Sequence, residues 1–328
     1  MQHRPFRRRL ARLGLGLLLG ATAAGVQAQA WPTKTIRIIV PSPTGGTLDI
    51  VGRFLAESLQ PVLGQQLIID NKAGAAGMIG VGEMLKAPHD GYTVMMHISG
   101  VVSEIPHIIK PPYDPFRDIK PLVELGRSGL VFVAAASFPV QNLKEVIANV
   151  KANPGKTNYG SYSPGTISHT LGIELNRLAG LDLNHIGYKG SPPALQDLMG
   201  GAVQLMFDGP VTSLPLIQSG RIKAIAVTSP QRMAALPSVP TFQESGYPSL
   251  SQLPWIGLWA PSDVPAPVQA RLREAAIQVL QQPRFRERLL TLGMEPGQGA
   301  SSEELAKSLQ LDHERHGALL KSIDFKPQ

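Results

Sequence analysis

Short runs of β-branched and apolar residues alternate with segments of helical periodicity along most of this 328-residue chain. The first run, 36–40, leads through a glycine-containing turn into a helical pattern. Strands are expected again at 66–70 and 92–98, with a helix over 79–86 between them. Because strand and helix alternate in this way, the sequence predicts a parallel sheet flanked by helices.

A second series of the same kind begins at residue 130. Its expected strands are 130–136, 158–161, 185–188, 203–207 and 222–228, and its expected helices are 143–152, 166–179 and 192–199. A proline-rich passage, 237–265, then leads into a helix-rich tail. The two series could form successive domains, or the tail could complete the first domain. The absence of a flexible Gly/Ser linker favours two closely joined halves with a cleft between them.

The first thirty residues have the order of a secretory signal peptide: a basic start, an apolar run over 13–26, and small residues at Ala28 and Ala30. The apolar run is shorter than the roughly 20 residues of a membrane span, which disfavours a membrane anchor. We expect cleavage after Ala30 and a periplasmic mature protein. Arg7-Arg8-Arg9 loosely resembles a twin-arginine signal, so the sequence leaves open the general secretory and twin-arginine routes.

Charge and cysteine content narrow the class of protein further. The formal net charge of +7 includes five arginines in residues 1–30, so the remainder carries only +2. No stripe of Lys and Arg with interleaved aromatics follows, and nucleic acid is therefore not an expected partner. With no cysteine and 43% hydrophobic residues, a soluble fold held by its core is predicted.

Three loops rich in small or hydroxyl residues, 41–49, 71–77 and 161–169, each follow an expected strand and precede a helix. The unpaired N–H groups and dipole of a helix start favour an anion, and Gly45 and Gly46 allow a ligand close to the backbone. The alternative for the first loop is an ordinary turn with Thr47 or Asp49 as cap. Because Asp49 would repel a carboxylate, capping or contact with a ligand amino or hydroxyl group is expected.

Catalytic and metal motifs are weak in this chain. Ser163, His169 and Asp208 could form a triad, but G-x-S-x-G, S-x-x-K with its companion motifs and a cysteine nucleophile are all absent. His169 is better explained as a hydrogen-bonding residue at a helix start. His313 and His316 lack the rest of a metal site, and no P-loop occurs. We therefore expect no enzyme activity, no metal and no cofactor.

Trp255 and Trp259 lie four residues apart in an apolar stretch. Core packing is the expected role of both side chains. A place in the cleft wall for one of them stays open.

Taken together, many short motifs in a fixed order resemble the Bug family, the extracytoplasmic solute-binding proteins of tripartite tricarboxylate transporters. The resemblance covers nearly all of the chain after residue 30. It rests on Trp31-Pro32, Pro41-x-Pro43-x-Gly45-Gly46-x-x-Asp49, Asp70-Asn71-Lys72-Ala73-Gly74-Ala75-Ala76-Gly77, Asp90-Gly91-Tyr92-Thr93, Ser168-His169, Tyr188-Lys189-Gly190-Ser191, Phe207-Asp208 and Pro237-x-Val239-Pro240-Thr241.

This resemblance implies a two-domain α/β architecture, the type II periplasmic-binding-protein fold, with a ligand cleft at the hinge. Residues 31–128 plus 253–328 would form domain 1, and residues 129–252 domain 2. The implied ligands are small carboxylates: di- and tricarboxylates, aromatic acids or acidic amino acids. The implied partners are integral-membrane transporter subunits, and we expect the protein to act as a monomer.

Ligand contacts are expected from loops of both domains. The expected contact residues are Ser42, Thr44, Gly45, Gly46, Thr47, Asp49, Ala75, Gly77, Ser161, Ser163, Gly165, Thr166, His169, Tyr188, Lys189, Gly190 and Asp208. Thr44 and Gly187 stand where the family usually has proline, and Gln204 replaces an acidic residue, so the ligand of a relative is not inherited. A secreted hydrolase and a solute sensor for a signalling partner are the alternative functions.

Overall fold

The computed structural model describes residues 31–322, and the expected signal peptide lies outside this range. The chain divides into two compact units, residues 1–33 and 34–328, and all contacts reported below lie within the second. In that unit the described strands form two sheets, one of six strands and one of five. No helix within residues 31–322 is long and apolar enough to cross a bilayer.

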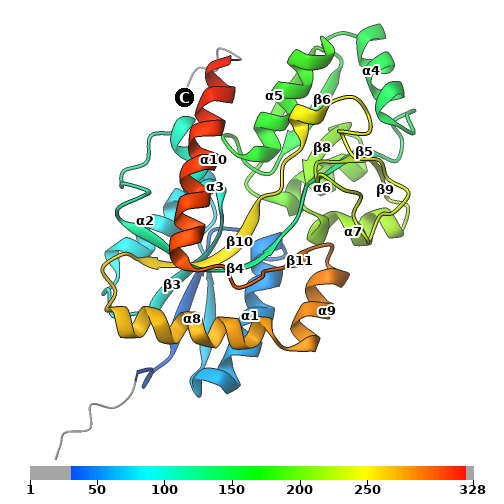
Figure 1. Ribbon diagram of the computed structural model, residues 1–328. Coiled ribbons are helices and arrows are strands. Elements are labelled where there is room, and N and C mark those ends of the chain that lie inside the picture. The colour runs from blue at the N-terminus through cyan, green and yellow to red at the C-terminus, as the bar shows by residue number, and fades with distance from the viewer. Residues whose placement is uncertain (1–30, 323–328) are drawn as a thin grey trace, which may run out of the picture. The chain divides into compact units, whose positions relative to one another are not determined.

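The first sheet joins strands from both ends of the chain, in the order β11-β4-β10-β3-β1-β2. Strand β1 pairs in parallel with β2 and β3, whereas β10 runs antiparallel to β3 and β4. The strands are β1 (Ile36–Val40), β2 (Leu67–Asn71), β3 (Thr93–Ile98), β4 (Ile119–Arg127), β10 (Trp255–Pro261) and β11 (Glu295–Pro296). Segments more than 150 residues apart in sequence, β3 and β10, therefore lie side by side (Figure 1).

The second sheet is built from the middle of the chain, in the order β7-β6-β8-β5-β9. Strand β6 is parallel to β7 and β8, and β5 is antiparallel to β8 and β9. The strands are β5 (Val131–Ala135), β6 (Thr157–Ser161), β7 (Leu183–Gly187), β8 (Leu205–Asp208) and β9 (Ile222–Val227).

The expected parallel pairing is confirmed for β1 with β2 and β3. Both sheets are mixed, however, because β5, β10 and β11 pair antiparallel to their neighbours. The sequence pattern also did not predict strands β4 and β10. Every residue of β10 is buried, so it shows none of the polar/apolar alternation of a half-exposed strand. Helical and strand periodicity cannot be separated in a continuous apolar run of this kind.

Helices cover both sheets, and α8 and α10 pack on β4 of the first one (Figure 1). The helices are α1 (Thr47–Leu63), α2 (Met78–Lys86), α3 (Gly100–Ser103), α4 (Leu143–Ala152), α5 (Ile167–Ala179), α6 (Ser191–Gly200), α7 (Pro210–Gln218), α8 (Ala266–Leu280), α9 (Pro283–Thr291) and α10 (Ser302–Ser322), with short 3₁₀ turns η1 (Ala75–Gly77), η2 (Ile105–His107) and η3 (Pro248–Leu250). The C-terminal elements thus return to the first sheet.

Each sheet has its own core. On one face of the second sheet, Phe132 stacks on Phe207 with 4.4 Å between ring centroids, and Phe242 packs beside them. The first sheet buries a cluster around Met95 and Trp259. Two separate hydrophobic cores are what two domains require, but the exact domain bounds stay a prediction.

Candidate ligand-binding site

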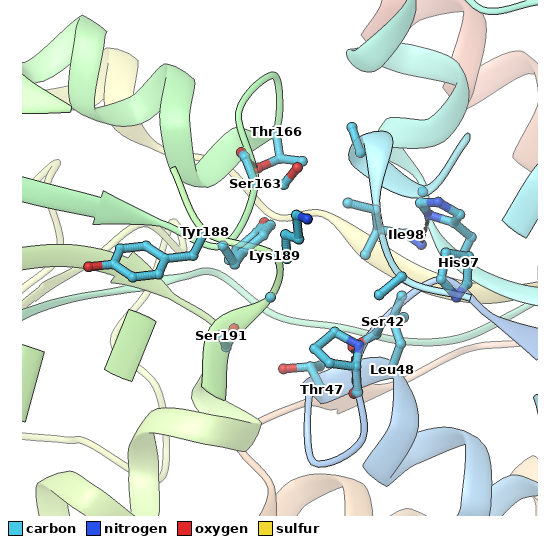
Figure 2. A pocket seen from close by; sticks show the side chains of 18 of the residues that line it. Ser42, Thr47, Leu48, His97, Ile98, Ser163, Thr166, Tyr188, Lys189 and Ser191 are labelled. Atoms are coloured by element: carbon cyan, nitrogen blue, oxygen red, sulfur yellow. Dashed lines mark hydrogen bonds between the residues drawn. The ribbon is translucent and has the colours of Figure 1, made fainter. Parts of the chain in front are cut away.

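A cavity of about 440 Å³ lies between residues of the two sheets (Figure 2). Loops that follow β1, β2, β6 and β7 and the ends of β3 and β8 contribute to its wall. Ligands of open α/β sheets bind at this carboxyl edge, and the volume suits a small organic molecule. The polar lining residues are Ser42, Thr47, His97, Ser128, Tyr162, Ser163, Thr166, Tyr188, Lys189 and Ser191.

The first residues of two helices line the cavity: Thr47 of α1 and Ser191 of α6. The loop before α1 is held by Asp49, whose carboxylate accepts hydrogen bonds from the Gly45 N–H at 2.9 Å and from the Arg53 guanidinium. Burial acts to raise the pKa of Asp49, but the hydrogen bonds from Arg53 and Gly45 outweigh it and lower that pKa. Asp49 therefore holds the loop before α1 from behind, and the hydrogen bond runs to Gly45 rather than to the N-cap residue Gly46.

Loops from the two sheets touch each other beside the cavity. A Cβ atom on Gly190 would lie 2.3 Å from Cγ of Pro43, and one on Gly209 would lie 3.0 Å from Oγ1 of Thr47. Gly190 also has a φ of +118°, which side chains rarely adopt. Glycine at 190 lets the loop before α6 close directly onto the loop before α1.

The charged side chains of the cavity wall are of one sign, positive. Among the described residues that line it, Lys189 is the one Lys or Arg side chain, and no Asp or Glu is present. Figure 2 shows the Lys189 side chain extending into the space between the two groups of labelled residues. Together with two helix N-termini, this arrangement favours an anion.

Tyr188 is among the residues that line the cavity, but its ring points away from the other labelled residues in Figure 2. Its hydroxyl donates a hydrogen bond of 2.6 Å to the Asp197 carboxylate, and burial raises the pKa of this phenol to about 12. The Tyr188 hydroxyl is therefore engaged in the protein rather than offered to a ligand.

Behind the wall, Asp208 holds a pair of hydroxyl groups. Its two carboxylate oxygens accept hydrogen bonds from Ser191, at 2.5 Å, and from Thr212, at 2.6 Å. Asp208 is fully buried, and burial raises its pKa to about 6. The carboxylate thus positions Ser191, the first residue of α6, at the cavity surface.

The structure brings nine of the seventeen expected contact residues to the cavity wall. They are Ser42, Thr47, Ala75, Gly77, Ser163, Thr166, Tyr188, Lys189 and Gly190. The other eight, Thr44, Gly45, Gly46, Asp49, Ser161, Gly165, His169 and Asp208, lie next to these residues in sequence or pack behind them. Ligand contact by any of the seventeen stays a prediction.

His169 and Ser161 are examples of residues packed behind the wall. Nδ1 of His169 accepts a hydrogen bond from the Gly165 N–H, and its ring stacks on His185 at 3.9 Å. Burial lowers the pKa of His169 to about 4. The Ser161 hydroxyl lies 2.7 Å from Nε2 of His185. These contacts support the interpretation of His169 as a structural residue.

The expected contact residues do not include His97, Tyr162 and Ser191, which all line the cavity, although Tyr162 lies within the expected loop 161–169. His97 is the last residue but one of β3, so its place near the carboxyl end of a strand was an available signal. Trp255 also lines the cavity, whereas Trp259 is fully buried and donates from Nε1 to the His97 carbonyl at 3.1 Å. One tryptophan of the pair is therefore at the wall and the other in the core.

The three triad candidates have different partners. The Ser163 hydroxyl donates to the Pro164 carbonyl, His169 accepts from Gly165, and Asp208 accepts from Ser191 and Thr212.

The histidine considered as a metal ligand, His313, packs against another histidine. Its ring stacks on His107, and its carbonyl lies 2.8 Å from the His107 ring nitrogen. Within residues 31–322, no group of three or more His, Asp or Glu side chains is arranged to hold a metal.

Comparison with known proteins supplies the family. The profile described as "Tripartite tricarboxylate transporter family receptor" matches residues 51–325. The structure of the periplasmic binding protein BugD is 34% identical, covers 91% of this chain and 100% of its own, and superposes with a TM-score of 0.87.

Two similar structures contain ligands. A protein of R. palustris with adipate is 29% identical, with a TM-score of 0.87 over 91% of this chain and 100% of its own. MatC from Rhodopseudomonas palustris with bound malate is 29% identical, with a TM-score of 0.83 over 88% of this chain and 100% of its own. The expected periplasmic-binding-protein fold is confirmed, and the chain belongs to the Bug family of tripartite tricarboxylate transporter receptors.

Proposed function

We propose that this protein is an extracytoplasmic solute-binding protein that captures a small carboxylate and delivers it to integral-membrane transporter subunits. The observation that carries the proposal is the charge of the cavity wall, which has Lys189 and no acidic side chain among its described residues. A carboxylate buried there gains a cation and the starts of α1 and α6. The malate and adipate held by two relatives are carboxylates as well.

Capture proceeds by closure of two domains, 31–128 plus 253–328 and 129–252. The direct approach of Pro43 to Gly190 supports this step, because these residues belong to loops of different sheets. A ligand held by the α1 side recruits the α6 side and stabilises the closed arrangement. The closed monomer is then the form recognised by the membrane partner in the periplasm, which the expected signal peptide allows it to reach.

Isothermal titration calorimetry with mono-, di- and tricarboxylates, aromatic acids and acidic amino acids tests the proposal. We expect at least one class to bind and to raise the melting midpoint. Lys189→Met should lower affinity for that ligand roughly tenfold or more, since a charge-assisted hydrogen bond contributes about 1.5–3 kcal/mol. Lys151→Met, on the exposed side of α4, is the control and should bind like the unmodified protein.

Small-angle scattering tests the closure step with the same ligand. A saturating ligand should reduce the radius of gyration, and an unchanged radius would argue that the cleft is already closed without ligand. If no carboxylate of any class binds, the proposed function is wrong. Turnover of an ester or amide panel that is lost in Ser163→Ala would replace it with a hydrolase.

A further inference from the structure

His97 and Trp255 line the cavity from the first sheet. Their ring N–H donors, Nε2 of His97 and Nε1 of Trp255, are buried and have no hydrogen-bond partner among the described residues. Each side chain belongs to a residue that is only 3% exposed. A buried donor left unpaired destabilises the protein, because it has lost its hydrogen bonds to water without replacement. In a binding protein, such a donor on a residue that lines the cavity is a candidate for pairing with the ligand.

The proton of the His97 ring is placed by its backbone contact. Nδ1 accepts a hydrogen bond of 2.8 Å from the Ile98 N–H, so the neutral ring carries its proton on Nε2. Burial lowers the pKa of His97 to about 4, which keeps the ring neutral at pH 7. His97 is therefore a donor without charge.

A backbone turn covers this donor. A Cβ atom on Gly77 would lie 2.1 Å from Nε2 of His97, so only glycine fits over the ring. The same turn places Ala75 and Ala76 at φ values of +47° and +51°, where non-glycine residues rarely occur. Left-handed backbone at a residue with a side chain is strained, because Cβ crowds the following carbonyl oxygen. An unpaired donor and a strained turn thus lie in contact at the wall.

The rest of the wall limits the charge of the ligand. Lys189 offers one positive charge, and the described lining is otherwise neutral, with Leu48, Ile98, Ile109 and Leu130 as apolar members. A second carboxylate on the ligand would be desolvated without a matching cation, which is costly in an apolar environment. A neutral acceptor avoids that cost and still pairs with N–H groups.

We propose that His97 and Trp255 recognise a neutral hydrogen-bond acceptor at the far end of a monocarboxylate with an apolar body, and that the Gly74–Gly77 turn moves to admit it. The proposal rests on the proposed function, since Lys189 and the helix starts hold the carboxylate. It makes His97 and Trp255 specificity-determining residues. Relief of the strain in the turn and pairing of the covered donor both favour the ligand-bound arrangement.

Two sets of probes isolate the end group by calorimetry. The aliphatic set is 6-oxoheptanoate, 6-methylheptanoate and adipate; the aromatic set is 4-acetylbenzoate, 4-isopropylbenzoate and terephthalate. Within each set the molecules have nearly the same shape and end in a ketone, a branched alkane or a second carboxylate. We expect the ketone to bind about tenfold or more tightly than the other two in at least one set, as for a paired against an unpaired buried donor.

Variants assign that preference to the two donors. His97→Met removes the N–H and should reduce the ketone-to-alkane ratio to about one or two, while affinity for the alkane changes less than about threefold. His97→Gln restores an N–H at similar reach and should recover part of the ratio. Trp255→Phe keeps a ring without its N–H and should also lower the ratio. A merely structural role would instead weaken all probes equally.

Melting midpoints of the ligand-free variants check that each one folds. If His97→Met does not fold, Trp255→Phe decides the outcome alone. Equal binding of ketone and alkane, or tightest binding of adipate or terephthalate, overturns this inference but leaves the proposed function intact. The same holds if only carboxylates outside both sets bind. If no carboxylate binds at all, the proposed function is wrong, and this inference, which rests on it, is wrong with it.

Discussion

The carboxyl group of Glu104 accepts a hydrogen bond of 2.7 Å from the hydroxyl of Thr170. Glu104 lies between α3 and η2, beside the first sheet, whereas Thr170 belongs to α5 on the second. Glu104 is 2% exposed, and burial raises the pKa of its carboxyl to about 7. The titratable carboxyl group of Glu104 therefore links the part of the protein built on the first sheet to the part built on the second.

Stability should depend on the protonation of Glu104. Its pKa is higher in the folded protein than the usual 4.5, so the folded state binds this proton more tightly and loses stability as pH rises from about 4.5 to about 7. Glu104→Gln keeps an acceptor for Thr170 without the charge. The unfolding free energy of the variant minus that of the unmodified protein should therefore rise by about 1–3 kcal/mol from pH 5 to pH 8.

Urea unfolding at both pH values measures the effect. Glu287→Gln, on the exposed face of α9, is the matched control and should show the pH dependence of the unmodified protein. If Glu104→Gln also shows that dependence, Glu104 is already ionised at no cost in the folded state.

Gly46→Ala should weaken ligand binding. The added Cβ would lie 2.2 Å from Oγ of Ser42 and 3.2 Å from the Pro43 carbonyl, so Ser42 must leave its place in the cavity wall. We expect affinity for the natural carboxylate to fall roughly tenfold by calorimetry, with a stability loss of about 1 kcal/mol. Gly82→Ala, where a Cβ meets no atom within 4 Å, should bind normally. Unchanged affinity in Gly46→Ala would place the ligand away from this loop.

Gly172→Ala should destabilise the fold through overpacking. A Cβ at this position of α5 would lie 2.1 Å from Cε2 of Tyr159, a fully buried ring. We expect a loss of about 1–3 kcal/mol in urea unfolding. Gly200→Ala at the end of α6 meets no atom within 4 Å and should change stability by less than about 0.5 kcal/mol. Equal stability of both variants would show that the Tyr159 ring moves aside freely.

Asp208→Asn and Ser191→Ala should act on ligand binding through one hydroxyl group. Asp208 fixes the Ser191 hydroxyl at 2.5 Å, and Ser191 lines the cavity while Asp208 does not. We expect similar losses of affinity in the single variants, about threefold to thirtyfold, and no further loss in the double variant. Additive losses would instead indicate that Asp208 contacts the ligand directly.

Local pattern predicted much of the fold because its signals are local. The strand β1, the helix α1 and the turn between them follow from β-branched residues, glycine and apolar spacing within thirty residues. The same reasoning placed the binding loops at helix starts, and Ser42, Thr47 and Thr166 do line the cavity. These features depend on residues that are close in sequence, so they can be predicted from composition and spacing.

By itself, the sequence determined the α/β class, the family resemblance and the loops from which a site is built. Tertiary structure decided what those patterns could not contain: the antiparallel β10 between β3 and β4, the approach of Pro43 to Gly190, and the burial of His97 beneath Gly77. Each joins residues from different segments of the chain. Strand pairing, desolvation and steric fit depend on which distant atoms meet, and periodicity along one segment does not record that.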